Sequence, residues 1–258
     1  MSLLLIKLTL GPLLIWVATL AARRWGPTVG GWVAAFPLTS GPVSVFLALE
    51  QGREFAAVAA MNSILGISAA AAFYIVYVKS ARRFSWTIAL PCACIAHFLL
   101  LFILSLVPPV LPVAIVLSIA ILGAALLIIG CPDVKPDSVP TPWWDVPLRM
   151  GVAAGVLLLI TGIASFIGPK WSGLISPFPV FVSVLGVFAH VQSGFATTHQ
   201  LMRGTLFGSF AFVAFFVAVA LTVRDVSLPL VYLLATMLVL AVNFAMLRVI
   251  QGQGIGRQ

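Results

Sequence analysis

The chain carries one stretch of sequence twice, and the two copies are separated by a constant shift of 142 residues. Over residues 19–85, 16 of the 67 positions are identical to the position 142 residues later. The shared pattern is G-P-x3-G-x4-F-P-x7-V-F-x5-G, which begins at Gly26 in the first copy and at Gly168 in the second. Chance matching of apolar residues would not align glycine, proline and arginine with themselves in this way. Any fold of this chain must therefore hold two related units.

The composition is that of an integral membrane protein. Of the 258 residues, 62% are hydrophobic and 8% are charged, and the mean hydropathy is +1.19. Apolar runs of about 18 residues or more recur along the whole length, and each is long enough to cross a bilayer as a helix. We therefore expect an all-α integral membrane protein without a soluble domain.

The apolar runs, separated by turn and charge signals, predict nine transmembrane helices. Their ranges are 3–22, 28–50, 55–79, 84–106, 110–131, 146–167, 172–193, 200–223 and 228–250. The first run resembles a signal peptide, but its counterpart at 149–164 indicates that it belongs to the fold. The predicted organisation is a first repeat of four helices at 1–106, a linker helix with a Pro-rich loop at 107–142, and a second repeat of four helices at 143–258.

The positive charges predict the orientation. The formal net charge is +8, but the 14 Lys and Arg residues lie almost entirely between the apolar runs. This placement is typical of topology signals and lipid contacts, so we expect membrane lipids and no nucleic acid as partners. With nine helices, one side of the membrane (side A) receives four of these charges and the other (side B) receives ten. The positive-inside rule makes side B cytoplasmic, with the N-terminus outside and the C-terminus inside a bacterial inner membrane.

The odd number of helices also predicts how the two repeats are related. Helices one to four correspond to helices six to nine, and helix five is the linker. Because five helices separate each helix from its copy, the copies must run in opposite directions. This 4+1+4 arrangement is an inverted repeat, in which a pseudo-twofold axis lies in the membrane plane and alternating access follows from exchange of the two conformations.

Two equivalent prolines, Pro37 and Pro179, fall inside predicted helices two and seven. Proline removes a backbone donor and clashes with the preceding turn, so both helices should be broken or kinked there. Thr39 and Ser40 widen the first break. Backbone groups freed in this way must be buried in protein or line a wet cavity, and half-helix N-termini could hold an anionic group. The alternative is that the prolines only bend two helices for packing.

Few ionisable groups lie inside the predicted helices. Glu50 is the best candidate for a membrane-embedded carboxylate and hence for a proton carrier. Its repeat partner is Gln192, and the adjacent Gln51 matches Ser193. The alternative is that Glu50 ends its helix and pairs with Arg53.

A second group of polar residues occurs mainly in the second copy. His190 precedes Gln192 by two residues, and three polar residues open predicted helix eight. The three are His199, Gln200 and Arg203, and the equivalent residues of the first copy are Ala57, Val58 and Met61. The difference suggests asymmetric function, with Arg203 as an inner anchor as the alternative. Asn62 is an amide inside helix three that could join helices or contact a solute.

No cofactor or metal site is expected. Cys92, Cys94 and His97 form a short cluster without carboxylates, which is more typical of ordinary helix filling than of a metal site. Nor does the chain carry a phosphate-binding loop, an HExxH motif or a Ser/His pair at helical spacing, so we expect neither direct ATP use nor an enzyme.

The Gly30-Gly31-x-x-Ala-x-Phe-Pro segment resembles that of small uncharacterised bacterial four-helix membrane proteins, which are about half as long. This resemblance implies that the chain is a fused, inverted pair of such units. The general plan is similar to that of inverted-repeat secondary transporters with discontinuous helices, which is a likeness of architecture.

Three classes of function fit these features. The first is a secondary transporter of a small polar or anionic solute, with Glu50 as a proton-coupling group. The second is a flippase or scramblase for a phospholipid or polyprenyl carrier, which would need a groove open to the bilayer. The third is a non-catalytic membrane subunit. A homodimer is compatible with all three.

Overall fold

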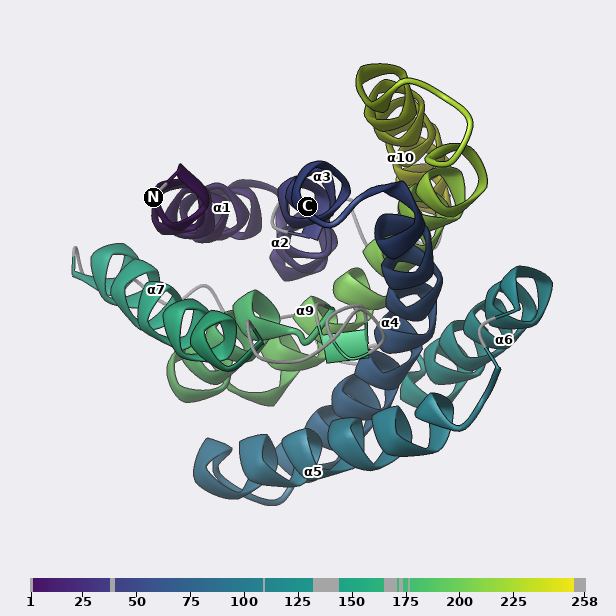
Figure 1. Cartoon of the computed structure of the whole chain (residues 1–258). Coiled ribbons are helices and arrows are strands. Elements are labelled where there is room, and N and C mark those ends of the chain that lie inside the picture. The colour runs from purple at the N-terminus through teal and green to yellow at the C-terminus, as the bar shows by residue number, and fades with distance from the viewer. Residues whose placement is uncertain are drawn as a thin grey trace.

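The structure, a computed structural model, describes residues 2–37, 40–108, 110–131, 144–164, 171, 174–175 and 177–252 (Figure 1). The described residues form helices and connecting turns and no strand. The helices are α1 (Ser2–Trp25), α2 (Pro27–Ala34), α3 (Ser40–Glu50), α4 (Arg53–Ala81), α5 (Trp86–Ser105), α6 (Leu111–Ile129), α7 (Asp145–Ala164), α9 (Val180–Thr222) and α10 (Leu228–Gly252).

Five of the described helices are long and apolar enough to cross a membrane: α4, α5, α6, α9 and α10. The helices α4 and α9 lie in the middle of the molecule and are largely buried (Figure 1). By contrast, α5, α6 and α10 expose large apolar side chains, for example Leu127 at 84%. Water would not tolerate an apolar surface of this extent, whereas lipid would cover it. The structure thus confirms the prediction of a helical protein of membrane type.

The helix bounds repeat with the same shift as the sequence. Shifted by 142 residues, α4 corresponds to 195–223, and α9 ends at Thr222. Shifted in the same way, the start of α5 falls on Leu228, the first residue of α10, and the start of α1 falls one residue before Asp145, the first residue of α7. The two copies therefore fold into the same succession of helices wherever both are described.

The equivalent prolines lie at helix ends. α2 ends at Ala34 and α3 begins at Ser40, with the buried Pro37 between them. Thr39 lies outside the described residues. Pro179 is buried and immediately precedes α9.

Two equivalent glycines make the bends that follow. The element α9 comprises two helical segments that meet in a bend at Gly194, which is non-helical with φ 73° and ψ −167° and lies between the predicted helices 172–193 and 200–223. Its equivalent Gly52, between α3 and α4, has φ 92° and ψ 167°. Both glycines adopt a backbone conformation that L side chains rarely reach. The two repeats therefore make the same bend at the same position.

The two halves pack on each other by reciprocal contacts. A Cβ on Gly66 of α4 would clash with the carbonyl oxygen of Leu174. A Cβ on the equivalent Gly208 of α9 would lie 2.7 Å from the carbonyl oxygen of Trp32, and Trp32 is the equivalent of Leu174. The two contacts thus involve equivalent residues with their roles exchanged. Glycine is required at both positions because the backbones touch.

The central helices α4 and α9 run antiparallel. Arg53, at the start of α4, donates from Nη1 to the carbonyl oxygens of Arg224 (3.2 Å) and Val226 (2.9 Å), just beyond the end of α9. At the opposite end, the Arg82 guanidinium that follows α4 lies 5.3 Å from the ring centre of Phe195, the residue after Gly194. We call these two ends of the molecule the Gly52 end and the Gly194 end.

The linker helix α6 joins the two central helices along one side. Ser68 of α4 donates to the Ser118 hydroxyl of α6 at 2.7 Å, and Ser118 in turn donates to the Ile64 carbonyl at 2.8 Å. The other end of α6 is held by α9, as described below. α1 and α7 lie on the other side of the central pair (Figure 1).

Candidate functional site

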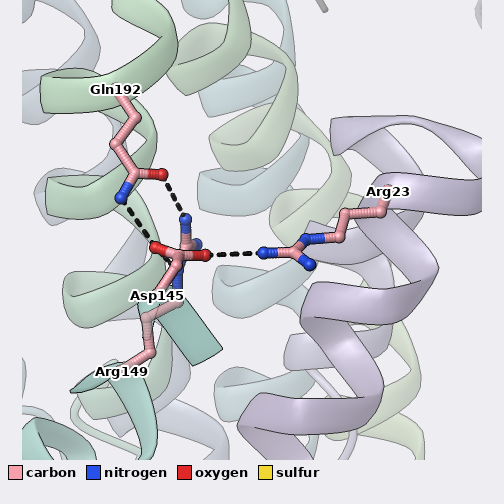
Figure 2. Close-up of polar contacts among 4 residues, drawn as sticks. All are labelled: Arg23, Asp145, Arg149 and Gln192. Atoms are coloured by element: carbon pink, nitrogen blue, oxygen red, sulfur yellow. Dashed lines mark hydrogen bonds and ion pairs between the residues drawn. The ribbon is translucent and has the colours of Figure 1, made fainter. Parts of the chain in front are cut away.

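A buried carboxylate joins three helices at the Gly194 end. Asp145 is the first residue of α7, and its side chain is fully buried. It accepts a hydrogen bond at Oδ2 from Nη2 of Arg23, at the end of α1, at 2.9 Å. It also accepts one at Oδ1 from Nε of Arg149, one turn further along α7, at 2.9 Å. Figure 2 shows the carboxylate between the two guanidinium groups.

Gln192 of α9 completes the cluster. Its Nε2 donates to Asp145 Oδ1 at 2.6 Å, and its Oε1 accepts from Arg149 Nη2 at 2.9 Å (Figure 2). The Arg149 guanidinium also lies 4.8 Å from the ring centre of Phe188, one turn earlier on α9. We call Arg23, Asp145, Arg149 and Gln192 the network. It fastens α1 and α7 to the part of α9 that precedes the Gly194 bend.

The electrostatics favour an ionised Asp145. Burial alone would raise the pKa of its carboxyl, but the hydrogen bonds from Arg149, Gln192 and Arg23 hold this pKa below its usual value. The position in the first turn of α7 adds the favourable field of a helix N-terminus. Arg149 is 8% exposed, so its buried positive charge is compensated by this carboxylate, whereas the Arg23 side chain is 39% exposed. Separation of α9 from α1 and α7 at this end would therefore require the hydrogen bonds of Gln192 to a buried ion pair to be broken.

Of these four residues, only Gln192 is among the site residues predicted from the sequence. Arg23 and Arg149 are among the 14 positive charges that predict the orientation, and Asp145 immediately precedes the predicted helix 146–167. One signal was available: Asp145 and Arg149 are four residues apart at the start of a predicted helix, the spacing of an intrahelical ion pair. The contact with Arg23, 122 residues away in sequence, could not be read from spacing.

The predicted carboxylate Glu50 lies elsewhere. Glu50 is the last residue of α3, at the Gly52 end, and both Glu50 and the following Gln51 are exposed. The alternative pairing with Arg53 does not occur among the described contacts, because Arg53 donates to backbone carbonyls beyond α9. Ser193 is half-buried beside Gln192.

Within the repeat, the network has a sequence counterpart at the Gly52 end. Gln192 corresponds to Glu50, Arg149 to Lys7 and Asp145 to Leu3. Each set thus contains one acid and one base, but the acid occupies a different position in each. The side chains of Lys7 and Leu3 lie outside the described residues.

The polar residues at the start of predicted helix eight hold the end of α6. The His199 Nε2 lies 3.1 Å from the Ile129 carbonyl oxygen. Arg203 is 4% exposed and donates to the carbonyls of Leu126 and Gly130. Cations commonly bind the free carbonyls at a helix C-terminus. Because the linker helix has no counterpart, this contact gives a packing reason for the absence of such residues from the first copy.

The remaining predicted site residues are dispersed. Asn62 is buried and donates from Nδ2 to the Val58 carbonyl of its own helix at 2.8 Å. Ser40 and Gln200 are buried, on α3 and α9. His190 of α9 is half-buried, with its ring centre 6.0 Å from that of Tyr77 on α4. The structure therefore does not gather the predicted residues into one cluster.

Cys92 is exposed and Cys94 half-buried. Among the residues that the structure describes, no three His, Cys, Asp or Glu side chains are grouped so as to hold a metal.

The fold and these contacts define a class: a helical protein in which five of the described helices are long and apolar enough to cross a membrane. Comparison of the chain with known family models, curated proteins and solved structures finds no match.

Proposed function

We propose that the protein is a secondary transporter that moves a small polar or anionic solute by alternating access. The observation that carries this proposal is the reciprocal packing of the two repeats around the antiparallel pair α4 and α9. Antiparallel equivalents are what an inverted repeat requires, and inverted repeats provide two interchangeable conformations. The proposed topology has nine spans in a 4+1+4 order.

In this proposal the Gly194 end faces the cytoplasm. Arg23, Arg82 and Arg149 lie at this end, and the positive-inside rule assigns such residues to the inner face. The N-terminus is then outside and the C-terminus inside a bacterial inner membrane. The buried network closes the cytoplasmic end of the pathway.

The two bends give the proposed motion a place to occur. Gly52 and Gly194 each have open space where a Cβ would stand, so their conformation reflects the backbone path and not a steric contact. Rotation about Gly194 would separate Gln192 from Asp145 and release α9 from α1 and α7. The same rotation about Gly52 would move Glu50 at the other end.

Glu50 remains the proposed proton carrier. It is exposed at the end assigned to the outside, where it could take up a proton, and its equivalent Gln192 belongs to the network. Protonation of Glu50 at the outer end would thus change the charge at the position equivalent to Gln192, which belongs to the network at the inner end.

Transport in proteoliposomes tests the proposal. Purified protein would be reconstituted and offered labelled inorganic phosphate and labelled small carboxylates, with and without an imposed proton gradient. We expect saturable uptake that requires the gradient. Uptake that does not exceed that of protein-free liposomes would contradict the proposal.

Two further measurements separate the alternatives. A fluorescent phospholipid in the same liposomes would become accessible to dithionite in both leaflets if the protein were a scramblase. Glu50→Gln should abolish proton-dependent uptake while the protein still purifies as a single species. Unchanged gradient dependence in this variant would remove Glu50 from the mechanism.

A further inference from the structure

A row of aromatic rings connects the start of α9 with its Gly194 end. The ring centre of Phe178, which precedes Pro179, lies 6.4 Å from that of Phe73 on α4. Phe73 stacks on Tyr77 at 5.8 Å, and Tyr77 meets the edge of His190 at 6.0 Å. The row therefore follows the contact between α4 of the first repeat and α9 of the second. Its last member, His190, is two residues from Gln192 of the network.

Two polar atoms at the end of this row have no hydrogen-bond partner among the residues that the structure describes. Tyr77 is fully buried, and no described residue offers its hydroxyl a hydrogen bond. The same holds for Nδ1 of His190, which is itself shielded from solvent. Buried polar groups are normally hydrogen-bonded, so an unpaired group in the core needs an explanation such as a missing ligand or water. Tyr232 shows the usual solution, because its hydroxyl lies 2.9 Å from that of Ser44.

The packing of the fold does not itself require these polar groups. In the equivalent positions of the other half, Val219 stands for Tyr77 and Ala48 for His190. Both of these residues are apolar and buried. The hydroxyl and the imidazole of one half thus have buried, apolar counterparts in the other half.

The surroundings favour a negatively charged ligand with an apolar body. Arg149 lies over Phe188, and Arg82 over Phe195, so cations flank the stretch of α9 that carries His190. The carboxylate at this end, Asp145, is already engaged by the two arginines of the network. The rings of Phe73 and Tyr77 offer flat apolar surface. An organic anion with a planar ring matches this combination of donors, positive charge and aromatic surface.

We propose that Tyr77 and His190 bind the solute, that the solute is a small organic anion with a planar apolar body, and that the site is reached from the Gly194 end when the network opens. This inference rests on the proposed transport function and names the substrate class. The Tyr77 hydroxyl and the Nδ1–H group of His190 donate hydrogen bonds to the anionic group of the solute. The rings of Phe73 and Tyr77 contact its apolar body.

Binding of labelled benzoate to the full-length protein in lipid nanodiscs tests the site. Benzoate is the probe because it combines a carboxylate with a single planar ring. We expect saturable binding that Tyr77→Phe and His190→Ala each weaken at least about tenfold, as expected for loss of a hydrogen bond to a charged group. Tyr232→Phe also loses a tyrosine hydroxyl, but away from the row, and should bind benzoate like the wild type.

The outcomes separate this inference from the transport proposal. No saturable binding of benzoate, or equal weakening in Tyr232→Phe, would overturn the site. Saturable binding without uptake into proteoliposomes would keep the site and contradict transport. Uptake of other anions without benzoate binding would keep transport and overturn this substrate class.

Thiol labelling tests the route to the site without any ligand. His190→Cys would be introduced after Cys92, Cys94 and Cys131 have been replaced by alanine, and labelled with a charged methanethiosulfonate. We expect the labelling rate to rise about tenfold when Asp145→Asn weakens the network. Arg23→Gln removes a partly exposed member and should act in the same direction if Asp145→Asn does not fold. Equal rates with the network intact and weakened would overturn access from the Gly194 end.

Discussion

The two ends of the molecule share a backbone path but are held by different polar contacts. At the Gly194 end, a fully buried carboxylate binds two arginines and a glutamine from three helices. At the Gly52 end, Arg224 and Glu54 form a two-point ion pair at 2.7 Å between α4 and the turn after α9, with side chains 41% and 73% exposed. Exposed pairs contribute little to stability, whereas removing one partner from a buried pair is costly. Two ends with the same backbone path can therefore be held by polar contacts of unequal strength.

The largest difference in stability between the two ends should appear when the carboxylates of Asp145 and Glu54 are removed in turn. Asp145→Ala leaves the buried Arg149 and Gln192 without their acceptor and should lower the free energy of unfolding by about 3–5 kcal/mol. Thermal unfolding followed by size exclusion in detergent would measure the loss. A melting temperature close to that of the wild type would show that the network does not hold the Gly194 end.

Low pH should remove the stabilisation that ionised Asp145 gives to the Gly194 end. The pKa of Asp145 is lowered by folding from an ordinary value of 3.8, so its ionisation stabilises the native state above that pH. This stabilisation is lost as the pH falls through the lower native value. We expect the difference in melting temperature between wild type and Asp145→Asn to be constant from about pH 8 to pH 5 and to shrink below about pH 4. A difference that shrinks already between pH 7 and pH 5 would contradict this assignment.

The glycine bends should respond alike, because they are the feature that the two ends share. Gly194→Ala and Gly52→Ala each place a side chain at positive φ and should destabilise by about 1–2 kcal/mol. Neither added methyl meets another atom within 4 Å, so conformational strain is the only cost. Melting temperatures of the two variants would be compared directly, and clearly unequal losses would show that the bends differ in some further respect.

The smallest effect is expected for the exposed pair. Glu54→Ala should change the melting temperature less than either glycine substitution, and the change should diminish as salt is added. Arg224→Ala is the matched variant on the other side of the pair. A loss of stability as large as that of Asp145→Ala would show that the polar contacts at the two ends contribute equally, and would contradict the difference between them.

The sequence was sufficient to predict the all-helical, membrane-type class and most helix starts, because these depend on apolar run length and on Gly and Pro, which act locally. Gly194 falls between predicted helices seven and eight, where the structure bends. The network was beyond reach because it depends on tertiary proximity: Arg23 and Asp145 come from different repeats. His199 and Arg203 were seen as a polar addition, but their partners are backbone carbonyls of α6, which carry no sequence signature.

The linker helix α6 makes the two sides of the central helix pair unequal. α6 is bonded to α4 through Ser118 and to α9 through His199 and Arg203, so it acts as a strap across one face of the central pair. The helices α1 and α7, which carry three of the four network residues, lie on the other side of the central pair (Figure 1). Two helices that are joined along one side can separate only on the other. If the halves of this protein separate, the hinge axis must therefore lie along α6.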